Sequence, residues 1–294
     1  MENMLTELTN KILVGDGAMG TMLFQKGLKQ GDAPETVCLN NPEVLEEIAK
    51  IYLDAGADII ETNTFGGSPL KLSDYNLQDK TGEINRIAVE RVRKAVGEEA
   101  YISGSVGPSG KMLKPFGDAD PEDIYQSFRR QIKVLIESGI DIICIETMID
   151  LNEAILAIKA VKSISQKIPI ITTMTFNETP RGFFTIMGND IETVSEQLEE
   201  NRADIIGSNC GNGIENMIKI AHEFKKYTKL PIIIQSNAGL PELKKGKIFY
   251  SETPEFFAEK TMELIAAGVS IIGGCCGTTP EHIQAIRKVV DNHI

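Results

Sequence analysis

One hydrophobic pattern recurs along the whole chain. A short apolar run rich in β-branched residues is followed by a turn rich in Gly, Thr or Asn, and then by a longer amphipathic segment. Continuous apolar runs are typical of parallel strands that helices cover, and the longer segments have the 3.6-residue period of helices. The pattern predicts strands over residues 12–16, 58–63, 101–106, 141–146, 170–175, 204–209, 232–236 and 270–274.

The segments between these strands carry signals for the start and the end of a helix. A side chain that can cap a helix precedes Pro and then Glu at Asn41, Asp120, Thr253 and Thr279. This order satisfies free backbone N–H groups and places a carboxylate at the positive end of the helix dipole. A glycine follows three of the helical segments and is expected to end each helix, at Gly56, Gly139 and Gly268.

Eight strand–helix units follow one another in 294 residues without a linker or a change of composition. They predict a single domain over residues 1–294, folded as an α/β protein of the (β/α)8 TIM-barrel class. A doubly wound open sheet is the alternative, but it would need fewer strands or a second domain. Residues 15–20, GDGAMG, also lack the GxGxxG spacing of a dinucleotide-binding fold, so a barrel is expected.

Composition and charge narrow the class of function. A net charge of −12 argues against a nucleic-acid partner, and we interpret the short basic stretch KKGK at 244–247 as a solvated loop. No apolar run reaches the roughly 18 residues of a membrane span, and the first residues, MENMLTELTN, lack the features of a signal peptide. We therefore expect a cytoplasmic protein that binds neither nucleic acid nor membranes.

Unusual polar side chains gather where the predicted strands end. In a barrel, these ends meet at the face that carries reactive groups. On strand 141–146, alternation places Cys144 and Glu146 on one face, so that Glu146 points over the barrel mouth. The residues at the strand ends are Asp16, Thr62, Asn63, Thr64, Glu146, Cys210, Asn237, Cys275 and Cys276.

Three of the five cysteines lie on glycine-rich turns after strands: Cys210, Cys275 and Cys276. We interpret the other two, Cys38 and Cys144, as small buried hydrophobic residues. Neighbouring side chains of a regular strand point to opposite faces, so the adjacent pair can reach one ion only if the flanking glycines let the backbone bend. Three thiolates with an open fourth position suit zinc, and buried or redox-active cysteines are the alternative.

These motifs resemble the homocysteine S-methyltransferase family, and within it most closely the N-terminal homocysteine-binding barrel of the cobalamin-dependent methionine synthases. The resemblance extends over essentially the whole chain, and its paired-cysteine element is highly specific. The stretches that carry it are GDGAMGT at 15–21, TNTFG at 62–66, GPSG at 107–110, ET at 146–147, NC at 209–210, NAG at 237–239 and GGCCGTTP at 273–280.

The resemblance implies a metal centre and its chemistry. Cys210, Cys275 and Cys276 would hold one catalytic Zn²⁺ per chain, and Asn237 matches a residue that can occupy the open zinc position before substrate arrives. Homocysteine's thiol, with an ordinary pKa of about 8.5, would be deprotonated by coordination. The sulfur would then attack an activated methyl group and form methionine, without a general base besides the metal.

The resemblance also implies how the rest of the substrate binds. Asp16 and Glu146 match the carboxylates that receive its ammonium group, although Asp16 could instead be a turn-forming side chain. The substrate carboxylate would meet backbone amides at the start of the first helix, which is suited to anions. These amides belong to Ala18, Met19, Gly20 and Thr21, and Asn63 is expected to line the site.

The methyl donor is the open point. Betaine, S-methylmethionine and S-adenosylmethionine carry a cation that an aromatic cage would bind. The chain has no Trp, and Met148 stands near where the betaine-using branch has aromatic residues, but Phe65, Phe116 and Phe176 lie in loops where a cage could form. The GPSG and CGTTP stretches look more like the corrinoid-dependent branch.

The chain lacks the Asp-x-His-x-x-Gly corrinoid motif, and we identify no cobalamin-binding, folate-binding or reactivation domain in it. We therefore expect a homocysteine-binding unit that receives its methyl group from a separate methylcorrinoid protein. The alternatives are a methyltransferase that uses one of the cationic donors or another thiol or selenol, and a zinc- and thiol-binding subunit without catalysis. Paired carboxylates at the mouth favour an enzyme, because a simple zinc sensor would not need them.

Overall fold

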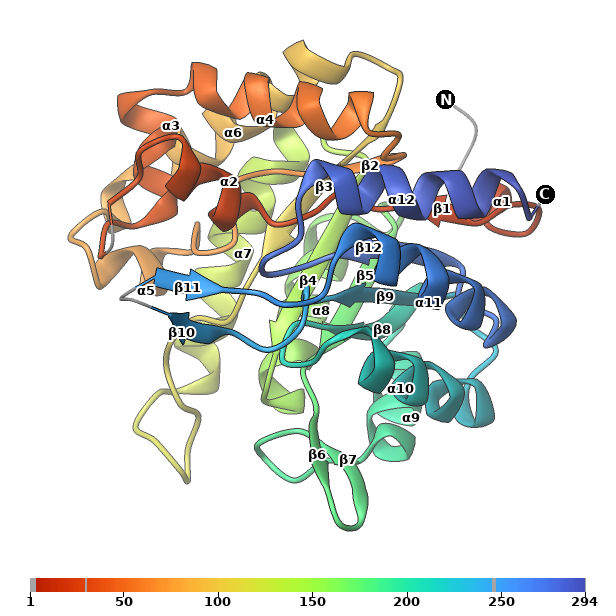
Figure 1. Cartoon of the computed structure of the whole chain (residues 1–294). Coiled ribbons are helices and arrows are strands. Elements are labelled where there is room, and N and C mark those ends of the chain that lie inside the picture. Colours follow the sequence, from red (N-terminus) through yellow and green to blue (C-terminus); the bar gives the residue numbers. More distant parts are fainter. Residues whose placement is uncertain (1–3, 30, 245–246, 294) are drawn as a thin grey trace.

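The computed structural model describes residues 4–29, 31–244 and 247–293, and a parallel barrel forms its centre (Figure 1). The barrel strands are β1 (Leu13–Val14), β2 (Ile59–Glu61), β3 (Tyr101–Val106), β4 (Ile142–Met148), β5 (Ile170–Met174), β8 (Ile205–Asn209), β9 (Ile232–Ser236) and β12 (Ile271–Gly274). They are neighbours in the order β1-β12-β9-β8-β5-β4-β3-β2, and a parallel bridge from Gly15 to Ile59 joins the two outer strands. The sheet therefore closes, which confirms the predicted barrel and excludes the open sheet.

Helices surround the barrel and follow its strands in turn. The outer layer is α4 (Glu43–Asp54), α6 (Thr81–Val96), α7 (Pro121–Glu137), α8 (Leu151–Ile164), α9 (Ile191–Glu200), α10 (Ile214–Tyr227), α11 (Pro254–Ala266) and α12 (Pro280–Asp291). Shorter helical segments are α1 (Met4–Glu7), α2 (Met19–Gln25), η1 (Pro34–Thr36), α3 (Val37–Asn40), α5 (Pro69–Ser73) and η2 (Gln78–Lys80). None of the described helices is long and apolar enough to span a membrane.

Most of the predicted helix ends are confirmed. The Asp120 and Thr253 side chains accept hydrogen bonds from backbone N–H groups in the first turns of α7 and α11. Gly56, Gly139 and Gly268 have φ of 95°, 89° and 81° directly after the ends of their helices, a conformation that glycine adopts without strain. The prediction at Asn41 was wrong, because α4 begins at Glu43 after Pro42 and has no side-chain cap.

Two hydrophobic layers follow from the alternation of side chains along each strand. Ile142 and Cys144 of β4 point into the barrel, whereas Ile143 and Ile145 pack against the helices, as predicted. Met4 of α1 joins the inner layer. Cys38 and Cys144 are fully buried, as the sequence predicted for both.

The loops after the strands form the barrel mouth, on the left of Figure 1, while α1 and the end of α12 lie on the right. Two hairpins in the loop regions were not predicted: β6 (Asn177–Thr179) with β7 (Gly182–Phe184), and β10 (Glu242–Lys244) with β11 (Lys247–Phe249). Three-residue strands outside the core have no long apolar run to reveal them. The second hairpin includes Lys244 and Lys247 of the basic stretch 244–247, whose residues 245 and 246 lie outside the described residues.

Close packing between neighbouring barrel strands gives a first prediction. A Cβ added at Gly207, on the inner face of β8, would lie 1.8 Å from the carbonyl oxygen of Ile233 on β9. We expect Gly207→Ala to lower the free energy of unfolding by about 1–3 kcal/mol or more, because a backbone strand cannot move aside freely. Urea unfolding at equilibrium measures this loss.

Gly82→Ala is the matched control, because a Cβ at Gly82 in α6 would meet nothing within 4 Å. Alanine stabilises a helix by roughly 0.5–1 kcal/mol relative to glycine, so this variant should be as stable as the native protein or more so. Equal stability of the two variants would contradict the packing described for β8 and β9.

Candidate active site

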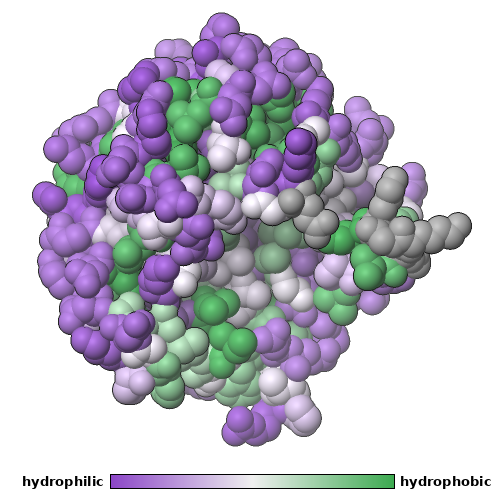
Figure 2. All heavy atoms as spheres, turned by 90° about the vertical axis from the view of Figure 1, so that its left-hand side faces the viewer, coloured by the Kyte–Doolittle hydropathy of each residue, from purple (hydrophilic) through white to green (hydrophobic). Residues whose placement is uncertain are grey.

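A pocket of about 390 Å³ opens at the barrel mouth, and Figure 2 looks onto this end of the molecule. Its walls come from the turns after β1, β2, β8 and β12, from η1, and from side chains of β2, β3, β4, β9 and α5. Asp16 and Asn237 are buried beside the pocket but are not among the residues that line it. The predicted site residues that do line it are Ala18, Met19, Gly20, Thr21, Asn63, Glu146, Cys210, Cys275 and Cys276.

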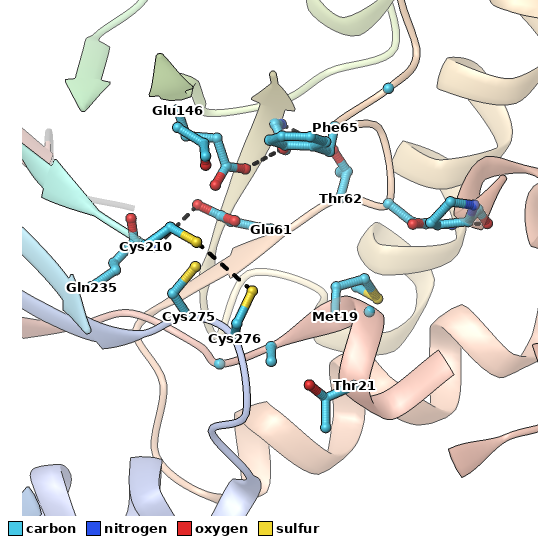
Figure 3. Close-up of a pocket in the computed structure, with 18 of the residues that line it drawn as sticks. Met19, Thr21, Glu61, Thr62, Phe65, Glu146, Cys210, Gln235, Cys275 and Cys276 are labelled. Carbon is cyan, nitrogen blue, oxygen red and sulfur yellow. Dashed lines mark hydrogen bonds between the residues drawn. The ribbon is translucent and has the colours of Figure 1, made fainter. Parts of the chain in front are cut away.

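The structure brings the three cysteines of the glycine-rich turns together at the floor of this pocket (Figure 3). All three Sγ atoms lie within 4.8 Å of one another, and those of Cys210 and Cys276 are 3.8 Å apart. Gly277 bends the chain after the pair with a φ of 82°. Cys210 itself has a φ of 60°, which is uncommon for a residue with a side chain and typical of functional sites. From the sequence, we expected the backbone of these turns to bend only at the flanking glycines.

The thiols perturb one another strongly. Hydrogen bonds from the Cys275 and Cys276 thiols lower the pKa of Cys210 to about 3. Hydrogen bonding with Cys210 raises the pKa of Cys276 to about 11, and it also raises the pKa of Cys275 well above its ordinary value. The three thiols therefore oppose one another's ionisation, and a dication would supply the positive charge that all three need to ionise.

Asn237 supplies a second sign that a cation fits here. Its side chain is 3% exposed and donates to Cys210, which helps to lower the pKa of that thiol. Its carbonyl oxygen, Oδ1, has no hydrogen-bond partner among the described residues. A buried acceptor without a partner is costly, and a metal ion beside the thiols would relieve that cost. The donor set and this oxygen together fit a metal ion.

Several side chains hold the turn that carries the cysteine pair. The Thr278 hydroxyl donates to the Cys275 carbonyl at 2.7 Å and accepts from the Ala18 N–H at 3.2 Å. The Gly277 N–H donates to the Thr21 hydroxyl at 3.2 Å, so the start of α2 is fastened to this turn. A Cβ on Gly277 would lie 2.1 Å from the Tyr250 ring, whose hydroxyl faces Cys276. Tyr250 was not identified from the sequence.

Glu146 lines the pocket near the cysteines and is held in place by two donors. The Ser105 hydroxyl donates to its Oε1, and the Asn209 side-chain amide donates to its Oε2 at 3.0 Å. The same amide donates to the Thr147 hydroxyl at 2.8 Å. Burial and the neighbouring Glu61 raise the pKa of Glu146 well above its ordinary value. A carboxyl with such a raised pKa would be stabilised in its charged form by a nearby cation.

Glu61 is a further residue of the site that was not identified from the sequence. It ends β2, lines the pocket beside Glu146, and accepts from the Gln235 amide at 3.3 Å (Figure 3). Burial and then the nearby Asp16 raise its pKa to about 7. The alternation that identified Glu146 applies here as well, because Glu61 shares the inward face of Ile59.

Asp16 lies beside this carboxyl at the closing seam of the barrel. Its Oδ2 accepts from the Glu61 backbone N–H at 2.9 Å, which links the end of β1 to the end of β2. Burial raises the pKa of Asp16 to about 7, and the charge of Glu146 contributes to the rise. Asp16, Glu61 and Glu146 thus form one carboxyl cluster, of which Glu61 and Glu146 face the pocket.

Comparisons with known proteins agree with this geometry. The chain is 31% identical to the methionine synthases of Mycobacterium leprae and Mycobacterium tuberculosis over 98% and 99% of its length, and it spans 25% of each relative. Its fold matches that of the metallated form of the homocysteine methyltransferase MmuM from Escherichia coli, with a TM-score of 0.81 and 23% identity over 96% of this chain and 98% of that one. The model of the homocysteine S-methyltransferase family matches residues 13–290. The chain therefore belongs to the homocysteine S-methyltransferase family, whose members are methyltransferases.

Proposed function

We propose that this chain is a zinc-dependent homocysteine S-methyltransferase that forms methionine. One observation carries the proposal: a cluster of three thiols and two buried carboxyls, Glu61 and Glu146, line one pocket. Homocysteine has a thiol at one end and an ammonium group at the other, and so it matches both clusters. Cys210, Cys275 and Cys276 would hold zinc, for which three sulfur ligands with a further position open are typical of a catalytic site.

Zinc, when bound, would supply the charge that keeps the substrate thiol ionised at neutral pH. The chain's own residues do the rest. Glu146, oriented by Ser105 and Asn209, would accept hydrogen bonds from the substrate ammonium, and Asp16 would add negative charge behind it. A buried carboxylate is costly without a cation, so the site favours a ligand that brings one.

The substrate carboxylate is assigned to the first turn of α2, which lines the same pocket. The Ala18 N–H already donates to Thr278, and the first N–H groups of a helix have no partner within it. The amides of Met19, Gly20 and Thr21 are therefore the donors in this proposal. Asn63 lines the wall, where its amide donates to the Pro34 carbonyl at 2.8 Å, and we assign it to shaping the pocket.

For the methyl donor we propose a separate methylcorrinoid protein. The loops expected to carry an aromatic cage do not form one: Phe176 is buried against Phe224, and Phe116 is 73% exposed and does not line the pocket. Phe65 and Tyr75 are the aromatic residues that line it among those described. The attraction between a cation and aromatic faces is strongest when the rings shield the cation from water. Two rings shield it less completely than a closed cage.

The rim of the barrel mouth also supports a protein partner. Apolar side chains stand around the hollow in Figure 2. Soluble monomers rarely expose a large apolar patch unless it binds a partner. These side chains belong to the loops after β3 and β9, and the most exposed are Met112, Phe116, Leu240, Leu243 and Ile248. Methylation by betaine, S-methylmethionine or S-adenosylmethionine is the alternative, and non-catalytic thiol binding is disfavoured by the carboxyl cluster.

Removal of one thiol tests the metal site. Cys275→Ala should reduce bound zinc from one per chain to well below one and abolish methyl transfer to homocysteine, because two thiols leave the site incomplete. Elemental analysis of the purified protein measures the zinc. Cys38→Ala, at a cysteine that does not line the pocket, should keep its zinc. Full zinc and activity in the Cys275 variant would refute the metal mechanism.

Replacement of the ammonium acceptor tests the other end of the substrate. Glu146→Gln keeps the size of the side chain but removes its charge, so the KM for homocysteine should rise about 10- to 100-fold. Zinc should stay near one per chain. Glu153→Gln is the matched control, because Glu153 is a buried carboxyl that accepts from Ser109 outside the pocket. An unchanged KM in the Glu146 variant would remove this residue from the substrate site.

A donor screen at fixed homocysteine distinguishes the proposed methyl donors. Methylcobalamin and a methylated corrinoid protein should support methionine formation, and the protein-bound donor should be better because it can use the apolar rim. Liquid chromatography with mass spectrometry measures the product. Efficient turnover of S-methylmethionine, S-adenosylmethionine or betaine, together with no reaction of either corrinoid donor, would contradict the corrinoid assignment.

A further inference from the structure

We propose that Glu61 is a second carboxylate in direct contact with the substrate ammonium, and that it makes the site selective for thiols that carry an amino group. This inference rests on the proposed function and extends it. Glu61 reaches the pocket from β2 and Glu146 from β4, and Figure 3 shows Glu61 between Glu146 and the three cysteines. An amino acid whose sulfur lies at the cysteines therefore passes Glu61 before it reaches Glu146.

The backbone and side chain of Glu61 are both held toward the pocket. Asp16 accepts from its backbone N–H at 2.9 Å, and the Gln235 amide donates to its Oε1 at 3.3 Å. This second bond is long for an N–H···O hydrogen bond, so it leaves the carboxylate with acceptor capacity. The Glu61 carboxyl also hydrogen-bonds with Glu146 and with Cys144. Its neighbours therefore fix its position directly beside Glu146, where one ammonium group can contact both carboxyls.

Gln235 supplies an independent sign of a missing donor. It lines the pocket beside Glu61 and is 4% exposed, and its Oε1 has no hydrogen-bond partner among the described residues. An ammonium group has three N–H donors. Glu146, Glu61 and Gln235 all line the pocket and carry acceptor oxygens, so one ammonium group has a donor for each of the three side chains.

The charge balance of the cluster points the same way. Among the described residues, neither Lys nor Arg forms an ion pair with Asp16, Glu61 or Glu146. Lys71 lines the same pocket, but its ammonium group pairs with Asp74 at 3.2 Å. Buried carboxylates are normally paired with a cation, and here a ligand would bring it. The raised pKa of Glu61, about 7, agrees with a carboxyl that lacks such a partner. A thiol without an amino group would leave the cluster uncompensated, and this is the basis of the selectivity.

The test compares homocysteine with 4-mercaptobutyrate, which keeps the thiol and the carboxylate but lacks the amino group. Both are titrated by calorimetry into the full-length, zinc-loaded native protein and its Glu61→Gln variant, without a methyl donor. The variant should bind homocysteine about 10- to 100-fold more weakly. Its affinity for 4-mercaptobutyrate should change by less than about threefold, because that ligand makes no hydrogen bond to the lost charge. Zinc should stay near one per chain.

Controls separate this inference from a structural role and from the proposed function. Glu61→Asp keeps the charge and should lose less homocysteine affinity than Glu61→Gln. If the Gln variant does not fold, Glu61→Asp replaces it in the test. Glu153→Gln should bind both ligands as the native protein does. Equal weakening of both ligands in Glu61→Gln would overturn the role of Glu61 and leave the proposed function intact. Failure of the native protein to bind homocysteine would overturn both.

Discussion

The site depends on buried negative charge with which no Lys or Arg of the described residues forms an ion pair. Three thiols lie within 4.8 Å of one another in the pocket, and the buried carboxyls of Asp16, Glu61 and Glu146 lie nearby. Groups of like charge cannot all ionise in a site of low dielectric constant, and their raised pKa values express this conflict. A metal ion and a substrate ammonium resolve it at the two ends, so ligand binding completes an electrostatic arrangement that the fold leaves unbalanced.

The closed barrel makes this concentration of charge possible. Parallel strands bring residues far apart in the sequence to one end, so Cys210 after β8 and Cys275 after β12 meet beside Asn237 of the loop after β9, the strand between them. Polar contacts among neighbouring turns then fix the functional side chains. Asn209 at the end of β8 donates to both Glu146 and Thr147 of β4. Thr278 connects the cysteine turn with the start of α2. The interior below is apolar, which gives the charged layer a rigid support.

Local patterns in the sequence predicted the barrel, because apolar runs repeat with each unit and polar residues mark the ends of most strands. The pattern also suggested that the three cysteines meet, but the resemblance to the family was needed to favour a metal site over buried or redox-active cysteines. Glu61 was missed because it lies within an apolar run and is followed at once by the more conspicuous Thr62, Asn63 and Thr64. The left-handed conformation of Cys210 and the position of Tyr250 over Gly277 depend on contacts between distant turns, which periodicity does not encode. Asp16 and Asn237 were expected at the site, and only the structure shows that they lie behind its walls.

The central claim is that one homocysteine molecule binds to both parts of the site: its sulfur to the metal at the cysteines, and its ammonium group to the carboxyls. Calorimetric titration of homocysteine into zinc-loaded protein and into the same protein after zinc removal tests it most directly. The account predicts one homocysteine bound per chain in the loaded protein, and an affinity at least about tenfold lower after zinc removal, because the thiol end loses its charge partner. Equal affinity with and without zinc, in protein shown by circular dichroism to remain folded, would contradict the account.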